Sequence, residues 1–200
     1  MQKRVACILL ASGYGKRFGE NKLLKNFCGK PLFEYTVNSL PLSLFCEVVV
    51  VTQYPEIIKI AQTYGLKTVR NSMVDPEISA TIQLGLKSID SEPTDGCMFC
   101  VCDQPLRERS SIINMLNLFE ETPHKIIALS YAQKKGNPVI FPSSLYIELA
   151  KLSGKQSGSA IIEKHGDLLT LCPAHNKWEL LDIDTLDDFQ KLEAKETAKP

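Results

Sequence analysis

A short apolar run near the N-terminus of the chain leads directly into a glycine-rich, basic loop, and this combination narrows the possible folds. Residues 5–10 read VACILL, which is typical of a strand buried on both faces of a parallel sheet. Glycines let backbone N–H groups approach a ligand, and basic side chains add positive charge. The stretch therefore predicts a polyphosphate-binding loop. Its glycines and basic residues are Gly13, Gly15, Gly19, Lys16, Arg17 and Lys22.

Neither of the two common phosphate-loop motifs fits this loop. The dinucleotide fingerprint G-x-G-x-x-G fails because Phe18 stands at the third glycine position and Gly19 comes one residue late. A Walker A loop would need a glycine where Leu10 stands and a serine or threonine where Arg17 stands. On this stretch alone, an ordinary strand-to-helix turn with solvated lysines remains the alternative.

Predicted strands alternate with predicted helices along the rest of the chain. Strands are expected at 5–10, 47–52, 67–70, 96–102, 126–131, 139–141, 168–171 and 180–184. Helices are expected at 31–40, 55–65, 82–89, 108–121, 143–151, 158–165 and from 186 onward. This alternation predicts one α/β domain with a mostly parallel central sheet and helices on both faces.

Charge and composition argue against several classes of protein. The 23 Lys and Arg residues balance the 23 Asp and Glu residues, so no global basic field favours nucleic-acid binding. We find no apolar run long enough to span a membrane and no signal peptide. Seven cysteines, several of them in apolar runs, are typical of buried free thiols in a reducing cytoplasm. Cys97 and Cys100 form a CxxC, but strand residues three apart face opposite ways, which disfavours a zinc site.

Asp103 is the leading candidate for a metal ligand. It directly follows the apolar strand 96–102, and ligands of such sheets bind at the carboxyl ends of the strands, where the glycine loop also lies. Mg²⁺ usually takes one or two carboxylates together with phosphate oxygens. A helix-capping role is disfavoured because the next helix starts several residues later. Asp182 and Asp184 share one face of the expected strand 180–184, and Asp184 is slightly favoured as a second ligand.

Nucleotidyl transfer fits these residues better than covalent catalysis does. It requires positioning and charge stabilisation rather than a protein nucleophile, and Lys22 and Arg17 would balance phosphate charge. The three histidines, His124, His165 and His175, are scattered along the sequence and indicate no nucleophilic triad.

Five segments resemble the signatures of one enzyme family. LLASGYGKRFGENKLLKNFCGKPL resembles the L-A-x-G-x-G-x-R-[FM]-G-x-x-K signature and the later G-K-P-L of sugar-phosphate and cofactor nucleotidyltransferases. CDQPL, GNPVIF, LSGKQSGSAII and LDIDTLDDF resemble four further motifs of the molybdenum cofactor nucleotidyltransferases. The resemblance spans about residues 5–189, and its nearest branch is the cytidylyltransferases of the MobA/MocA-like NTP transferase family.

The resemblance implies a Rossmann-like nucleotidyltransferase fold, with a nucleotide-binding part at about 1–105 and an acceptor-binding part at about 106–190. It also implies residue roles. The catalytic residues would be Lys22, Arg17 and Asp103. The nucleotide-binding residues would be Leu10, Ala11, Ser12, Gly13, Gly15, Lys22, Ser79 and Thr81. The acceptor-binding residues would be Lys135, Gly136, Asn137 and Pro138, and the Mg²⁺ ligands Asp103 and Asp184.

The activity implied by the resemblance is Mg²⁺-dependent transfer of CMP from CTP to the phosphorylated molybdenum-pterin cofactor, with release of pyrophosphate. A molybdenum hydroxylase would receive the product, and neither nucleic acid nor membrane would be a partner. Ser12 stands where the guanylyltransferase branch has glycine, which favours cytidine. Three alternatives stay open: transfer from GTP to the same acceptor, transfer to a sugar or alditol phosphate, and a non-catalytic carrier of the pterin.

Overall fold

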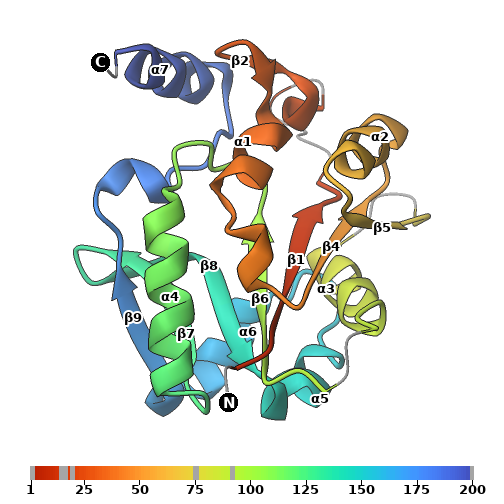
Figure 1. Ribbon diagram of the computed structural model, residues 1–200, viewed down its shortest axis with the longest axis vertical. Helices are drawn as coiled ribbons and strands as arrows, with labels where there is room; N and C mark the ends of the chain where they lie inside the picture. Colours follow the sequence, from red (N-terminus) through yellow and green to blue (C-terminus); the bar gives the residue numbers. More distant parts are fainter. Residues whose placement is uncertain (1–2, 14–17, 19–20, 74–76, 91–92, 199–200) are drawn as a thin grey trace.

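A central mixed β-sheet organises the protein, whose computed structural model describes residues 3–13, 18, 21–73, 77–90 and 93–198; a small antiparallel pair, β2 (Asn26–Phe27) and β3 (Lys30–Pro31), lies apart from this sheet. The sheet has seven strands in the order β5-β4-β1-β6-β8-β7-β9, and Figure 1 shows it running through the centre of the molecule. The strands are β1 (Val5–Ala11), β4 (Glu47–Thr52), β5 (Lys67–Arg70), β6 (Gly96–Val101), β7 (Ile126–Tyr131), β8 (Lys134–Pro142) and β9 (Leu169–Pro173). Only β8 runs antiparallel to its neighbours. The predicted fold class is confirmed.

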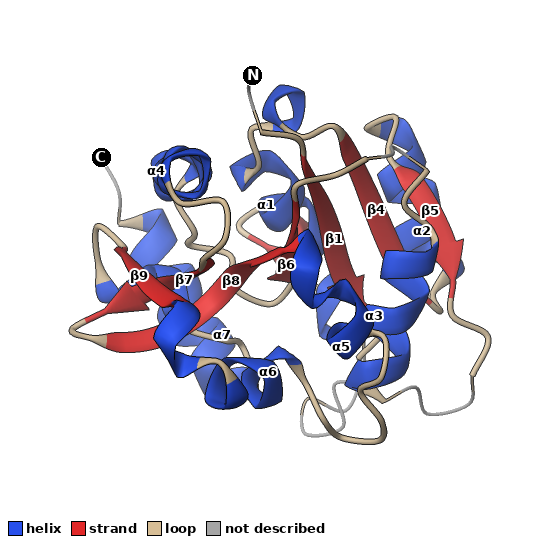
Figure 2. Cartoon of the chain, turned by 90° about the horizontal axis from the view of Figure 1, so that it is seen from below, coloured by secondary structure: helices blue, strands red, loops and turns tan. Residues whose placement is uncertain are grey.

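Helices cover both faces of the sheet (Figure 2). They are α1 (Leu32–Ser39), α2 (Pro55–Thr63), α3 (Ile78–Lys87), α4 (Arg109–Glu121), α5 (Tyr146–Leu149), α6 (Gly158–Lys164) and α7 (Leu186–Thr197). Side chains of α1, α2, α4 and α7 pack into one buried cluster, and those of α3, α5 and α6 into another. Among the described residues, no helix is long and apolar enough to cross a membrane.

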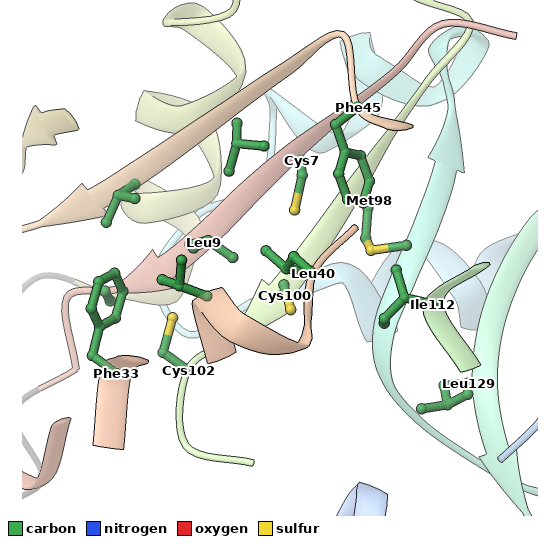
Figure 3. Close-up of a cluster of buried hydrophobic side chains, with 14 of the residues drawn as sticks. Cys7, Leu9, Phe33, Leu40, Phe45, Met98, Cys100, Cys102, Ile112 and Leu129 are labelled. Atoms are coloured by element: carbon green, nitrogen blue, oxygen red, sulfur yellow. The ribbon is translucent and has the colours of Figure 1, made fainter. Parts of the chain in front are cut away.

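Strand β1 supplies alternate side chains to the two cores. Cys7 and Leu9 lie in one cluster, while Ala6 and Ile8 lie in the other, because successive strand residues face opposite ways. Figure 3 shows Cys7 and Leu9 with Cys100 and Met98 in the first cluster. This two-sided burial is the reason that β1 is a continuous apolar run.

The register of the central strands brings their carboxyl ends together. Leu10 of β1 pairs with Val51 of β4 on one side and with Val101 of β6 on the other. The residues that follow these strands therefore emerge at one edge of the sheet. Ser12 and Asp103 lie at this edge, as the sequence predicts.

The expected strand at 180–184 is wrong. Lys177–Leu180 is instead a turn of 3₁₀ helix, and no regular strand follows it. The buried Glu179 carboxylate accepts hydrogen bonds from the backbone N–H groups of His175 (2.7 Å) and Glu108 (3.1 Å). These contacts fold the chain into a turn, although its alternating pattern resembles a strand.

The hairpin between β7 and β8 extends further than the sequence predicts. Strand β8 begins at Lys134, so the polar segment 134–138 belongs to the strand rather than to a loop. Ala132 and Gln133 form the turn and both have positive φ, 48° and 64°. A two-residue hairpin turn needs such angles, which Asn and Gly usually supply. Neither residue type is present here, so the turn has no sequence signal.

Candidate functional site

Two adjoining cavities open at the carboxyl ends of β1 and β6. The first measures about 240 Å³, and its lining includes Leu10, Ser12, Gly13, Lys22, Thr81 and Asp103. The second measures about 190 Å³ and lies toward β8 and α6. Leu10, Ile78 and Val101 line both, so ligands in the two cavities would be neighbours.

Lys22 connects its own turn to two distant segments, the one after β6 and the one before α7, at the first cavity. Its Nζ donates to Asp103 Oδ2 (2.8 Å), to the Ile183 carbonyl oxygen (2.6 Å) and to Asp184 Oδ1 (3.2 Å). The turn that carries Lys22 is fixed because the Asn21 side chain caps it by accepting from the Leu23 N–H. Burial alone would lower the pKa of Lys22, but the carboxylates of Asp103 and Asp184 outweigh it and raise the pKa.

The two carboxylates beside Lys22 fit a divalent cation. Asp103 Oδ1 is buried and has no hydrogen-bond partner among the described residues, so a strong acceptor is left to a ligand. Asp184 has a more exposed side chain (55%) and faces the same ammonium group. No group of three potential metal ligands occurs in the described parts of the chain. Carboxylates of Asp103 and Asp184 could therefore hold Mg²⁺ together with oxygens of a bound phosphate.

Asp182 does not contact Lys22, because it binds a different side chain. Its Oδ1 accepts from Gln104 Nε2 at 2.8 Å, whereas Asp184 faces Lys22. Burial, and then the negative charge of Asp103, raise the pKa of Asp182. The structure therefore brings Asp184, and not Asp182, to the ammonium group that Asp103 contacts.

The loop after β1 is supported by side chains that follow β4. Gln53 Nε2 donates to the Ser12 carbonyl (2.9 Å), and the Tyr54 hydroxyl donates to the Gly13 carbonyl (3.0 Å). The Ser12 hydroxyl is buried and donates to the Val51 carbonyl (3.1 Å). Sequence reasoning missed Gln53 and Tyr54, although their place directly after a strand neighbouring β1 was the available signal.

The remaining nucleotide-binding candidates differ in their placement. Thr81 lines the first cavity and accepts from Asn71 Nδ2 (3.3 Å). Ser79 lines neither cavity, and its hydroxyl donates to the Gly154 carbonyl (2.7 Å). Ala11 is fully buried in β1. The other two expected phosphate-binding residues, Gly15 and Arg17, lie outside the described residues.

Three of the four acceptor-binding candidates line the second cavity. They are Lys135, Gly136 and Asn137; Pro138 is next to them in β8 but does not line it. Lys135 Nζ donates to Ser159 Oγ (3.2 Å) across the cavity. A Cβ atom at Gly136 would overlap the end of the Leu180 side chain, so β8 lies close to the segment that leads to Asp182 and Asp184.

The sequence matches the family described as the MobA-like NTP transferase domain over residues 7–168. The chain belongs to this family. The predicted resemblance is thereby confirmed, and the protein is an enzyme of the nucleotidyltransferase type.

Individual relatives agree with this assignment. The chain is 26% identical over 201 residues to a probable molybdenum cofactor guanylyltransferase of Bacillus subtilis (strain 168), with 94% of each chain covered. It is 27% identical over 195 residues to a protein of the same name from Pyrococcus furiosus, with 92% of this chain and 94% of that one covered. A crystal structure of the Rv0371c homologue from Mycobacterium sp. strain JC1 shares the fold, with a TM-score of 0.82, 22% identity and 98% of both chains covered.

Proposed function

We propose that this MobA-like transferase moves a nucleoside monophosphate from a nucleoside triphosphate to the phosphorylated pterin of the molybdenum cofactor. The observation that carries the proposal is the Lys22–Asp103–Asp184 cluster, in which Lys22 and Asp103 line the first of the two adjoining cavities. The first cavity would take the nucleotide and the second the acceptor. Two relatives named as molybdenum cofactor guanylyltransferases support this acceptor.

The reaction needs positioning and charge rather than a covalent intermediate. A terminal phosphate oxygen of the acceptor attacks the α-phosphorus of the nucleotide, the bond to the β-phosphate oxygen breaks, and pyrophosphate leaves. Asp103 and Asp184 would hold Mg²⁺, which when bound neutralises phosphate charge and orients the triphosphate. The Lys22 ammonium stabilises the negative charge that builds on the α-phosphate. The Gly13 backbone, fixed by Tyr54, keeps the loop against the nucleotide.

We further propose CTP as the donor. A side chain at position 12 fills part of the loop where the guanylyltransferase branch has glycine, and a pyrimidine needs less room than a purine. The Ser12 hydroxyl already donates to the Val51 carbonyl, so Ser12 would select the base by its size and not by a hydrogen bond to it. GTP is the alternative donor, because the two relatives are named as guanylyltransferases.

The test is pyrophosphate release with Mg²⁺ and purified molybdenum cofactor, comparing CTP, GTP, ATP and UTP. Release with CTP alone is expected. Release with GTP alone would show that the donor is GTP and not CTP, while the proposed acceptor would stand. If no nucleotide supports release, the same assay with sugar and alditol phosphates would reveal another acceptor. Nucleotide and pterin binding without any release would instead identify a carrier.

A further inference from the structure

Arg107 is a buried cation without a counter-ion among the described residues. Its side chain contacts Val101 and Gln104, which lie on either side of Asp103 in the sequence, and the residue is only 4% exposed. Nη1 donates to Cys100 Sγ (2.9 Å), and Nη2 donates to the Val101 carbonyl (3.1 Å) and to Gln104 Oε1 (2.9 Å). Nε is buried with no partner in the described part of the chain. Arginine stays charged in proteins, so burying a guanidinium without a carboxylate partner costs free energy. Such a residue is therefore a candidate for a functional role.

The first consequence of Arg107 is that the Gln104 amide has a fixed orientation. A guanidinium has only donors, so the Gln104 atom that faces it must be the oxygen. The amide NH₂ must then face the other way. There it donates to Asp182 Oδ1 (2.8 Å) and to the Leu180 carbonyl (3.3 Å). Gln104 is 2% exposed, so water does not compete for either end of the amide.

The second consequence concerns which carboxylate reaches the site. Asp182 and Asp184 are two residues apart on one extended segment, and Gln104 binds the first of them. The Ile183 N–H donates to the Asp103 carbonyl (2.9 Å), and the Ile183 carbonyl accepts from Lys22. With Asp182 held and Ile183 anchored on both sides, Asp184 is the carboxylate that stands beside Asp103.

We propose that Arg107 and Gln104 are positioning residues that pair Asp103 with Asp184 and thereby set the affinity of the site for a divalent cation. The inference rests on the proposed function, which assigns Mg²⁺ to these two carboxylates. Neither residue lines either of the two cavities. They act through the hydrogen-bond chain from Arg107 through Gln104 to Asp182, in the way that outer-shell partners orient metal ligands elsewhere.

The test measures Mn²⁺ binding directly, by the electron paramagnetic resonance signal of free Mn²⁺. It uses the full chain with α,β-methylene analogues of CTP and GTP, so no turnover is involved. Arg107→Met and Gln104→Met keep the side-chain volume but remove the polar groups. Each is expected to raise the Mn²⁺ dissociation constant by about 10-fold or more. Arg109→Met, at an exposed arginine two residues away, is the matched control and is expected to bind Mn²⁺ as the wild type does.

Thermal unfolding of the same variants separates positioning from folding. A merely structural role would lower the melting temperature and leave the Mn²⁺ affinity of the folded protein unchanged, which would overturn the inference. If Arg107→Met does not fold, the neutral replacement Gln104→Met decides alone, and wild-type Mn²⁺ affinity in that variant refutes the proposal. If the wild type itself binds no Mn²⁺ with either analogue, the metal site of the proposed function fails, and the inference fails with it.

Discussion

Lys22 is the residue at which sequence-distant parts of the chain meet. The atoms that it contacts belong to residues 81, 161 and 162 positions away. Two carboxylates that share one ammonium group would repel each other without it. Lys22 therefore keeps Asp103 and Asp184 side by side, and in the proposed reaction it supplies charge to the α-phosphate.

Replacing Lys22 with alanine is expected to lower kcat for pyrophosphate release by about 100-fold, the usual loss when one charge-stabilising donor is removed. The fold should persist, because the side chain lines a cavity and does not belong to either buried hydrophobic cluster. Lys30→Ala, at an exposed lysine of the same N-terminal region, is the control. Turnover equal to wild type would remove Lys22 from the mechanism.

At the scale of elements, the approach of α3 to β1 depends on a single glycine. A Cβ atom at Gly85 would lie 2.6 Å from Cγ2 of the buried Ile8, far inside van der Waals contact. Ile8 is β-branched and held in a central strand, so it has little freedom to move. The close approach matters for the site, because α3 also carries Thr81 and Ile78 to the cavity walls.

Gly85→Ala is expected to lower the free energy of unfolding by about 1 kcal/mol, because overpacking exceeds the gain in helix propensity. Urea denaturation measures the difference. Gly166→Ala is the matched control, since no heavy atom lies within 4 Å of the Cβ position there. A Gly85→Ala protein as stable as wild type would show that α3 shifts outward without cost.

At the scale of the whole molecule, Asp95 ties three central strands together at the amino end of β6. Its carboxylate accepts from the Arg4 N–H (2.8 Å) and from Lys3 Nζ (3.2 Å). Its carbonyl accepts from the Ser143 N–H (2.8 Å), directly after β8. The Arg4 N–H and, to a lesser degree, the Lys3 ammonium lower the pKa of Asp95 against the opposing effect of burial.

Asp95 should therefore add a pH-dependent contribution to global stability. Because its folded pKa is lowered, the contribution is present above the unfolded value of about 3.9 and is lost as the pH falls through the folded pKa. Asp95→Asn is expected to be less stable than wild type at neutral pH, by under about 1 kcal/mol because the side chain is 36% exposed. Urea denaturation at several pH values should show the two proteins converging in acid. A difference that is constant with pH would contradict this account.

The central half of the sheet could be predicted from sequence, and much of the periphery could not. Strands buried on both faces leave continuous apolar runs, and topology places the residues after them; the position of Asp103 just beyond β6 was predicted in this way. The segment 180–184 was misread because the buried Glu179 carboxylate, a tertiary contact, decides its conformation. Arg107 and Gln104 were not predicted, because their roles depend on tertiary hydrogen bonds that the local sequence pattern does not show.

The position of β8 between β6 and β7 affects the incomplete chain while the protein is being synthesised. Translation completes β6 before it reaches β8, yet β8 is the neighbour that covers the second edge of β6 in the native sheet. A nascent chain that has passed only Val101 therefore carries an apolar central strand with one open edge, the kind of surface that pairs with other chains. Only the arrival of the β7–β8 hairpin closes it. The strands up to β6 are thus completed only by strands from later in the chain, and we expect them to be prone to aggregation until β7 and β8 have folded.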